Sequence, residues 1–332
     1  MHDTSVTAIS VIELNVCFPI RDGLMHSIRG QIRAVDGISL EMRAGETLAL
    51  VGESGCGKTT LGRTLVGLEQ PARGKITCLP GKADLCAMQS AARSRIIQMV
   101  FQDPLASLNP RMTVRTIITE GLVAHGIIAR KDAAAAACDL ATDVGLDVDT
   151  LGRFPHEFSG GQRQRIGIAR ALAMKPSFIV CDEAVSMLDV SIRVQILNLL
   201  RALQDEHNLG YLFIAHDLPV VRYIADRIAV MYMGRIMEQG PAEDLLQHPI
   251  HPYTRALRAA APDPRAAGAM PAVLPGEVPS QRDLPCGCRF HTRCQFALPE
   301  CSAVEPVLET PRDITDLARK VACIRKNDLP TI

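Results

Sequence analysis

TLALVGESGCGKTT, residues 47–60, joins an apolar run to a glycine-rich loop and then to the start of a second apolar segment. This order predicts a buried strand, a tight loop and a helix that begins near Lys58. The spacing from Gly52 to Gly57-Lys58-Thr59 matches the P-loop, which wraps around the phosphates of a nucleotide. An ordinary glycine turn is the alternative, and the flanking strand and helix patterns disfavour it. The stretch therefore predicts nucleotide binding.

Each residue type in this loop has a physical reason to be there. Glycines let several backbone N–H groups point inward, and the helix that follows adds its positive N-terminal end. Lys58 would reach the β- and γ-phosphates, and the Thr59 hydroxyl would bind Mg²⁺. Cys56 is either a small residue between two glycines or a reactive thiol whose pKa the positive field lowers. The loop residues predicted to bind nucleotide are Gly52, Ser54, Gly55, Gly57, Lys58, Thr59 and Thr60.

Composition limits the class of protein. The chain has 332 residues, with 36 Lys plus Arg and 36 Asp plus Glu, so no basic field indicates a nucleic acid partner. It has no run of eighteen apolar residues, and its N-terminus carries no signal-peptide pattern. We therefore expect a cytosolic chain that reaches a membrane only through a partner.

Eleven cysteines are many for such a chain, and disulfides are disfavoured in a reducing compartment. Six are scattered and are predicted to be small buried residues: Cys17, Cys56, Cys78, Cys86, Cys138 and Cys181. The other five fall between 286 and 323.

The first half of the chain predicts several short strands. Residues 9–18, 38–42, 74–77 and 96–101 have strand-like apolar patterns, an extended loop is expected over 21–33, and 79–95 has no clear pattern. Phe18 could stack on a nucleotide base or be a core aromatic. Residues 113–146 are helical in pattern and interrupt the alternation of strands and helices.

The second half returns to alternation. Ser159 and Gln162 have capping-box spacing at the start of a helix that should stop before Pro176. Strands are predicted over 177–181 and 211–215, a helix over 191–204, and a hairpin of 228–233 with 235–238.

Three of these strands deliver polar residues at their ends. Gln102 could contact Mg²⁺ or the attacking water, although such a residue alone is more often a surface side chain. Asp182 and Glu183 are placed to bind Mg²⁺ and to orient water beside a P-loop. His216 would lie on the same edge of the sheet, with a structural histidine as the alternative.

Taken in order, these motifs resemble the nucleotide-binding subunit of ABC transporters over residues 9–240. GESGCGKTT corresponds to Walker A, Gln102 to the Q-loop, FSGGQ to the signature, IVCDE to Walker B, SMLD to the D-loop and His216 to the switch histidine. VFQDPLASLNPRMTV, PHEFSGGQRQRIGIARAL, HPYTRAL and LPGEVPS resemble the oligopeptide/dipeptide importer group. Phe158, Ala184 and Met187 depart from the wider family, and none of them removes a catalytic group.

The resemblance implies that two such domains meet head to tail around ATP. Glu183 would be the general base, His216 would clamp the γ-phosphate, and Gln102 would report the nucleotide state. Mg²⁺ would be held by Thr59, Gln102 and Asp182. The signature and D-loop residues that would bind nucleotide are Ser159, Gly160, Gly161, Gln162 and Asp189.

The fold class expected is α/β: a RecA-like P-loop ATPase core with antiparallel strands, an inserted helical subdomain and a small cysteine-rich C-terminal extension. The core would comprise residues 1–102 and 159–245, the helical signature subdomain 103–158, and the extension 246–332. The helical subdomain would grip the membrane partner.

The extension begins with a predicted helix in HPYTRALRAAAPDP and carries CGCRFHTRCQFALPEC. Four thiolates in a segment with almost no apolar core suggest a metal staple. In the group that the chain resembles, this pattern implies a [4Fe-4S] cluster on Cys288, Cys294, Cys301 and Cys323, with Cys286 as a spare. Zinc on four thiolates and a set of unliganded thiols are the alternatives.

The leading interpretation is an ATPase that powers import of di- or oligopeptides. Import of a nickel chelate or another small solute is the alternative within the class, and a soluble ABC ATPase acting on ribosomes or DNA is the alternative outside it. Two permease subunits, a second ATPase subunit, favoured as a paralogue, and a solute-binding protein are the partners implied, at the cytoplasmic face of the membrane.

Overall fold

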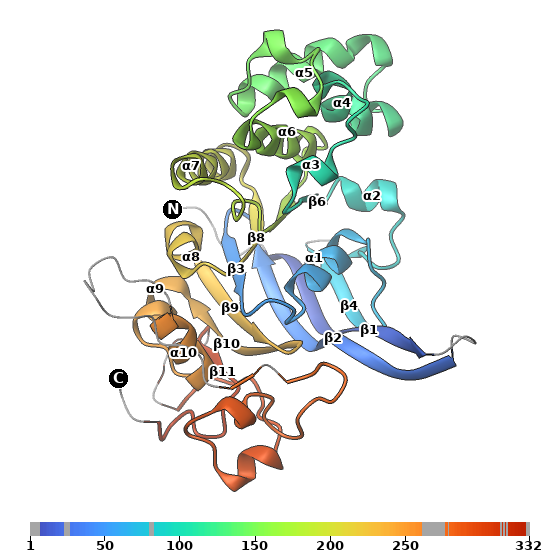
Figure 1. The fold of residues 1–332 in the computed structure, drawn as a ribbon. Coiled ribbons are helices and arrows are strands. Elements are labelled where there is room, and N and C mark those ends of the chain that lie inside the picture. Colours follow the sequence, from blue (N-terminus) through green and yellow to red (C-terminus); the bar gives the residue numbers. More distant parts are fainter. Residues whose placement is uncertain are drawn as a thin grey trace.

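The computed structural model describes residues 7–22, 27–79, 83–260, 276–277, 279–312, 314, 316 and 318–329. Two sheets organise it, a seven-stranded sheet in the order β11-β10-β9-β3-β8-β7-β6 and a four-stranded sheet in the order β2-β1-β4-β5. In Figure 1 the sheets occupy the middle of the molecule, with a block of helices at one end. The part of the chain that follows α10, here called the C-terminal segment, lies at the other end.

The strands are β1 (Thr7–Asp22), β2 (Ser27–Arg43), β3 (Thr47–Val51), β4 (Arg73–Cys78), β5 (Ala83–Asp84), β6 (Ile97–Val100), β7 (Phe178–Asp182), β8 (Gly210–Ala215), β9 (Arg227–Tyr232), β10 (Arg235–Pro241) and β11 (Lys320–Val321). The helices are α1 (Lys58–Val66), α2 (Ser90–Ser94), α3 (Pro104–Ser107), α4 (Val114–Ala124), α5 (Ala133–Asp143), α6 (Gly160–Ala173), α7 (Val190–His207), α8 (Leu218–Ile224), α9 (Ala242–Gln247) and α10 (Pro252–Ala260). The 3₁₀ turns η4 (His291–Arg293) and η5 (Pro299–Ser302) lie in the C-terminal segment.

The seven-stranded sheet is parallel where the site forms. Strands β9, β3, β8, β7 and β6 pair in parallel, and β10 and β11 extend the sheet in antiparallel register. The carboxyl ends of β3, β8, β7 and β6 therefore share one edge. A parallel arrangement needs cover on both faces, which explains why these strands are apolar without alternation.

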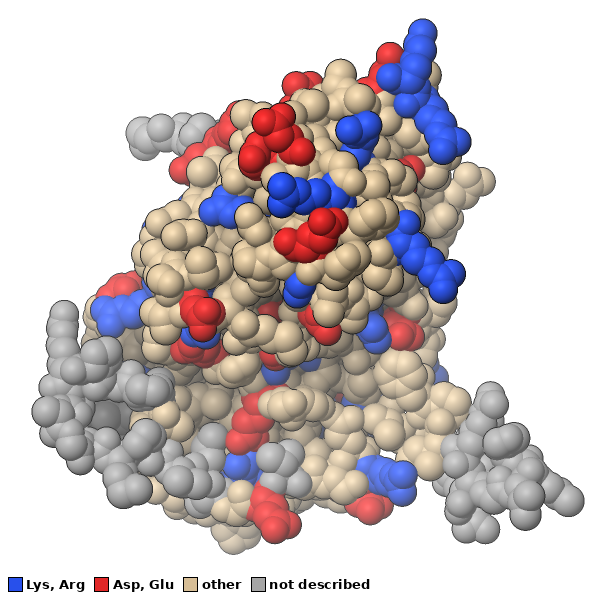
Figure 2. All heavy atoms as spheres, turned by 45° about the horizontal axis from the view of Figure 1, so that its top comes forward, with Lys and Arg blue, Asp and Glu red and all other residues tan. Residues whose placement is uncertain are grey.

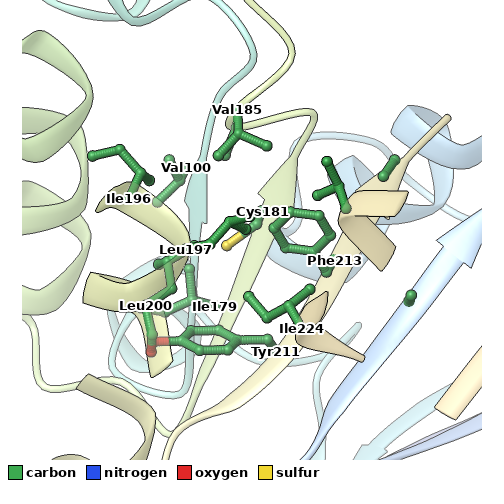
Figure 3. Packing of buried hydrophobic residues seen from close by; sticks show 14 of the residues in the cluster. Val100, Ile179, Cys181, Val185, Ile196, Leu197, Leu200, Tyr211, Phe213 and Ile224 are labelled. Atoms are coloured by element: carbon green, nitrogen blue, oxygen red, sulfur yellow. The ribbon is translucent and has the colours of Figure 1, made fainter. Parts of the chain in front are cut away.

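Successive residues of these strands point to opposite faces and enter two different cores. On β8, Tyr211 and Phe213 belong to the core shared with α6 and α7. Leu212 and Ile214 belong to the core shared with α1 and the antiparallel sheet. Figure 3 shows Tyr211, Phe213 and Cys181 packed with residues of α7. Cys181 is fully buried, as the sequence predicted, and burial raises its thiol pKa to about 12.

Helices α3, α4 and α5 form the helical block, and α6 packs against all three of them as well as against β6 (Figure 1). The alanine-rich run of α5 buries Ala137 and Ala141 completely. Small side chains on α5 favour its packing against α6. Helix α6, which the signature begins, thus joins the helical block to the sheet.

One expectation about local structure was wrong, and one stretch without a pattern contains short elements. Residues 21–33 were expected to be an extended loop, but β1 runs to Asp22 and β2 begins at Ser27, so that the two strands form a long hairpin. Cross-strand pairing along the hairpin overrides the polar, glycine-containing composition. Residues 79–95 showed no pattern, yet they contain β5 and α2, which are too short to produce one.

The C-terminal segment shares its packing with the ATPase core. Phe290 is buried against Tyr232 and Tyr253, with ring centroids 5.4 and 5.3 Å away. Cys288 and Cys301 belong to the same hydrophobic core. The expectation of almost no apolar core was therefore wrong, because the segment uses aromatic residues of β9 and α10 that lie far away in the sequence.

A buried ion pair also ties this segment to the sheet. Arg319 precedes β11, and its Nη2 donates to Glu238 Oε1 of β10 at 2.7 Å, with both side chains fully buried. Glu238 also accepts from the backbone N–H groups of Ile250 and His251. One carboxylate thus links β10, the start of α10 and the last strand.

We expect Arg319→Met to reduce the free energy of unfolding by about 3–5 kcal/mol, because it leaves the Glu238 carboxylate buried without its cation. Lys326→Met is the matched control: Lys326 pairs with Glu309, whose side chain is 58% exposed, and its loss should cost far less than the loss of Arg319. Denaturant unfolding of both variants measures the difference. Equal losses would show that the buried pair is not a structural anchor.

Candidate functional site

The carboxyl edge of the parallel strands opens into a cleft of about 360 Å³. It gathers residues from the antiparallel sheet, the P-loop, two strand ends and the C-terminal segment. Its lining residues are Phe18, Ile32, Ala34, Ser54, Gly55, Gly57, Lys58, Thr59, Thr60, Gln102, Glu183 and Gln281. A volume of this size is ordinary for a small-molecule site. Most of the predicted P-loop residues thus line one cleft together with Gln102 and Glu183.

The P-loop leads directly from β3 into α1. Gly57 has φ 107°, and a Cβ there would lie 2.0 Å from the carbonyl oxygen of Ala34, so only glycine fits. The Lys58 ammonium donates to the carbonyl oxygens of Gly52 at 2.7 Å and Glu53 at 2.9 Å. The loop therefore holds its lysine in place through its own carbonyl groups, and a bound phosphate would exchange with one of these contacts.

Thr59, in the first turn of α1, contacts Asp182 at the end of β7. The Thr59 hydroxyl donates to Asp182 Oδ1 at 3.0 Å. Burial raises the pKa of Asp182, and the hydrogen bond from Thr59 opposes that rise. A carboxylate and a hydroxyl at this distance are the oxygen donors that Mg²⁺ takes beside a nucleotide.

Gln102 and His216 both converge on the Glu183 carboxylate. Gln102 Nε2 donates to Glu183 Oε2 at 2.8 Å, and His216 Nδ1 lies 3.5 Å from the same oxygen. Glu183 has φ 45°, which is unusual for a residue with a Cβ, and its N–H donates to the Ile214 carbonyl. Strained backbone of this kind concentrates at functional sites. The structure thus brings together the three residues that the sequence predicted as catalytic.

Phe18 lines the cleft and is also half-buried against the core beneath α1. The interpretation of Phe18 as a core aromatic holds in part, and its stacking on a base stays a prediction.

The signature begins helix α6 with the predicted capping box. Ser159 Oγ accepts from the Gln162 N–H at 3.3 Å, and Gln162 Oε1 accepts from the Ser159 N–H at 2.9 Å. Ser159, Gly160 and Gln162 are exposed, as is Asp189 at the start of α7. Within the part of the chain that the structure describes, the residues lining the cleft include neither the signature nor Asp189. Their role at the nucleotide stays a prediction.

Cys56 is the small buried residue that the sequence allowed. Its side chain is 5% exposed, and burial raises its thiol pKa, with the Lys58 ammonium acting in the opposite direction. The alternative, a reactive thiol of lowered pKa, is wrong because burial outweighs the positive field.

Four of the five C-terminal cysteines share a pocket. Cys288, Cys294, Cys301 and Cys323 line it with His291 and Phe290, whereas Cys286 is exposed. Burial raises the thiol pKa of Cys288 and of Cys323 to about 11. Among the described residues, however, no group of three or more His, Cys, Asp or Glu is arranged so that it could hold a metal ion.

Residues of the C-terminal segment reach the P-loop, and sequence reasoning missed them. Gln281 lines the cleft and donates to the Gly55 carbonyl. Arg293 forms an ion pair with Glu53, and the Tyr253 hydroxyl accepts from the Glu53 N–H. No local pattern signals these contacts, because the partners lie 200 or more residues apart in the chain.

Comparison with known proteins gives the family. The family model described as ABC transporter matches residues 35–186, and that of the oligopeptide/dipeptide transporter C-terminal region matches 237–301. The oligopeptide transport ATP-binding protein AppF of Bacillus subtilis is 48% identical over 305 residues, which cover 90% of this chain and 93% of AppF. The chain belongs to the ABC transporter ATPases.

Other relatives agree with this placement of the ABC ATPase. The oligopeptide transport ATP-binding protein OppF of Salmonella typhimurium is 47% identical over 91% of this chain and 92% of its own. The solved structure of cbiO1 from Clostridium perfringens has a TM-score of 0.62 at 24% identity, over 73% of this chain and 92% of that one. The ATP-binding cassette MJ0796 bound to ADP and Pi has a TM-score of 0.61 at 23% identity, over 70% and 98% of the two chains. These two structures establish the cassette fold.

The charged side chains on the face drawn in Figure 2 reflect the equal numbers of basic and acidic residues in the chain. Figure 2 shows, on the face that includes the helical block, basic and acidic side chains interspersed among uncharged ones. None of the helices in the described ranges is long and apolar enough to cross a membrane.

We expect Cys56 to resist thiol reagents, because its thiol is buried and its pKa is raised. Maleimide labelling of the folded protein, followed by peptide mass spectrometry, should modify exposed Cys286 first and leave Cys56 unmodified over the same time. Inhibition of ATPase activity should be the same in wild type and in Cys56→Ser. Labelling of Cys56 as fast as Cys286, with ATP protecting it, would contradict this prediction.

Proposed function

We propose that this ABC ATPase is the ATP-hydrolysing subunit of a membrane importer of di- or oligopeptides. The observation that carries the peptide class is the match of residues 237–301 to the oligopeptide/dipeptide transporter C-terminal region. The relatives whose printed names refer to oligopeptide transport cover about nine-tenths of the chain. A nickel chelate or another small solute remains the alternative cargo, since the ATPase subunit does not itself bind cargo.

The geometry supports hydrolysis by an activated water. The phosphates of ATP would lie on the N–H groups of the P-loop and on Lys58, with Mg²⁺ held by Thr59, Asp182 and Gln102. Bound Mg²⁺ would neutralise charge on the phosphate oxygens. Glu183 accepts a hydrogen bond from Gln102 and lies beside His216, so its carboxylate can take the proton of a water that these side chains orient. His216 would then contact the γ-phosphate.

A second ATPase subunit completes the site in this proposal. Ser159, Gly160, Gly161 and Gln162 would cover the γ-phosphate of the opposite subunit, with Asp189 at the same interface. The exposed start of α6, with its free positive end, supports this role. ATP favours the closed pair only to the extent that it binds that pair better, and these contacts supply the difference. A paralogue is favoured over a second copy of this chain.

The membrane partners would be two permease subunits, served by a solute-binding protein, and the ATPase would lie at the cytoplasmic face. The helical block, residues 103–158, would hold the permeases. Exposed apolar side chains on this block support the assignment, and they are Leu105, Ile127, Val148 and Phe154.

Co-purification tests the assembly. Detergent extraction of membranes that contain the tagged ATPase should yield permease subunits in a fixed ratio, and a labelled tripeptide should be taken up by vesicles in an ATP-dependent manner. Recovery of nucleic acid or ribosomal proteins in place of permeases would support the soluble ABC ATPase instead.

We further propose that the cysteine pocket binds a metal centre through Cys288, Cys294, Cys301 and Cys323. The donor set supports this assignment, because four thiols line one pocket that contains no carboxylate side chain among its described lining residues. Ligation would require the four side chains to draw together and to lose their protons. A [4Fe-4S] cluster is the first candidate, and zinc is the second.

We expect Glu183→Gln to retain ATP binding and to reduce ATPase activity below about a tenth of wild type, because the amide cannot accept the proton. Glu206→Gln, an exposed carboxylate on α7, is the matched control and should keep wild-type activity. Steady-state phosphate release and equilibrium binding of a fluorescent ATP analogue are the measurements. Activity of Glu183→Gln above that level would reject Glu183 as the base.

We expect anaerobically purified protein to be brown, with absorbance at about 400 nm that is lost in Cys294→Ser. Metal analysis distinguishes the alternatives. A colourless protein with one zinc per chain would replace the cluster with zinc, and a metal-free protein would leave a set of buried thiols.

A further inference from the structure

The C-terminal cysteine segment, residues 286–302, makes a direct ion pair with the P-loop. Arg293 Nη1 and Nη2 donate to the two carboxylate oxygens of Glu53 at 2.7 and 3.1 Å. The Arg293 side chain is 4% exposed and that of Glu53 is 22% exposed. Two parallel hydrogen bonds between a guanidinium and a carboxylate fix direction as well as distance. This pair therefore constrains the orientation of Glu53, the residue directly after Gly52.

The backbone of Glu53 is held at the same time. Its N–H donates to the hydroxyl of fully buried Tyr253 at 2.8 Å. The ring of Tyr253 packs against that of Tyr232 at a tilt of 55°, with centroids 4.7 Å apart, and Arg293 Nη1 lies 3.4 Å from the Tyr232 hydroxyl. One residue of the loop is thus fixed through its side chain and through its amide by the same aromatic and arginine cluster.

Glu53 connects this cluster to the phosphate-binding lysine. The carbonyl oxygen of Glu53 accepts from Lys58 Nζ at 2.9 Å. A shift of Glu53 would therefore change the position of the ammonium group that meets the phosphates. The route from the C-terminal segment to the nucleotide is two contacts long: Arg293 to Glu53, and Glu53 to Lys58.

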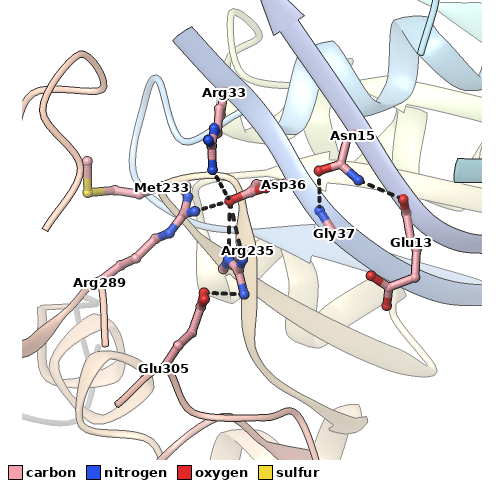
Figure 4. A network of polar contacts seen from close by, with 9 residues as sticks. All are labelled: Glu13, Asn15, Arg33, Asp36, Gly37, Met233, Arg235, Arg289 and Glu305. Carbon is pink, nitrogen blue, oxygen red and sulfur yellow. Dashed lines mark hydrogen bonds and ion pairs between the residues drawn. The ribbon is translucent and has the colours of Figure 1, made fainter. Parts of the chain in front are cut away.

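A second arginine of the same segment is linked to the loop indirectly. Arg289 donates to the Met233 carbonyl and to the Asp36 carboxylate, as Figure 4 shows. The next residue, Gly234, donates its N–H to the Cys56 carbonyl of the P-loop at 2.9 Å. Arg289 follows Cys288 and Arg293 precedes Cys294, so each anchor is adjacent to a cysteine of the pocket.

We propose that Arg293 is a positioning residue of the P-loop, which it holds through Glu53, and that the cysteine segment thereby contributes to nucleotide affinity. The proposal rests on the ATP site described above. It assigns to the C-terminal segment a role in ATP binding within the same chain. Because the coupling is between two sites, nucleotide binding must stabilise the cysteine segment by the same free energy with which the segment favours nucleotide.

The first test measures nucleotide affinity in the full chain. We expect Arg293→Gln to weaken Mg-ATP binding about tenfold and to raise the KM for ATP accordingly, while kcat changes less than about twofold. Arg293→Lys should restore only part of the affinity, since lysine cannot make the paired hydrogen bonds. Glu53→Gln should reproduce the effect of Arg293→Gln, and the double variant should be no weaker than either single one.

Controls separate this role from general instability and from failure of the ATP site itself. Arg258→Gln removes an exposed arginine of α10 that donates to the Gln247 carbonyl, and it should leave nucleotide affinity unchanged. Lys58→Ala should abolish binding if the P-loop binds ATP at all. Binding that survives Lys58→Ala would overturn the ATP site, whereas wild-type affinity in Arg293→Gln would overturn only the positioning role.

The second test measures the reverse effect. In hydrogen exchange, Mg-ATP should slow exchange in peptides covering residues 286–302 of the wild type, and this protection should be lost in Arg293→Gln. A purely structural arginine would leave the nucleotide-dependent difference intact. Protection of equal size in the two proteins would therefore contradict the proposal.

Discussion

The parallel pairing of β3, β8, β7 and β6 is the constraint on which the site depends. Parallel strands end at the same edge, so residues that follow them meet although they are far apart in the chain. Gln102 and His216 reach Glu183 because each lies one or two residues beyond the end of its own strand, and Thr59 reaches Asp182, the last residue of β7, from the first turn of α1. The hydrophobic burial that holds these strands together therefore also assembles the residues that we propose as catalytic.

The edge of the sheet supplies only part of what the proposed chemistry needs. The P-loop and the strand ends would bind phosphates and orient a water, but the signature at the start of α6 is not among the described residues that line the cleft. This division fits an ATPase that is active only when two subunits close. Helix α6, which the signature begins, packs against all three helices of the helical block, so the signature and the exposed apolar residues of the block are parts of one packed unit.

The C-terminal segment is packed into the ATPase core and is not a separate appendage. Phe290 adds to the core beside β9, the last strand of the segment extends the central sheet, and Arg293 pairs with Glu53 of the P-loop. The segment is tied to β10 by the pair of Arg319 with Glu238 and to the P-loop by the pair of Arg293 with Glu53. Arg293 directly precedes Cys294, one of the four cysteines of the pocket.

The sequence by itself determined the family, the P-loop, the acidic pair after β7 and the capped signature helix, because each of these is a local pattern of residue types at fixed spacing. It also indicated the buried nature of Cys181. Only the tertiary structure decided the hairpin of β1 and β2, the burial of the Cys56 side chain, and the contacts of Arg293, Tyr253 and Gln281 with the P-loop. Those features depend on pairings across long stretches of chain, and no local spacing encodes them. The tertiary structure thus places the cysteine segment in contact with the P-loop, whereas the sequence pattern indicated only a separate C-terminal extension.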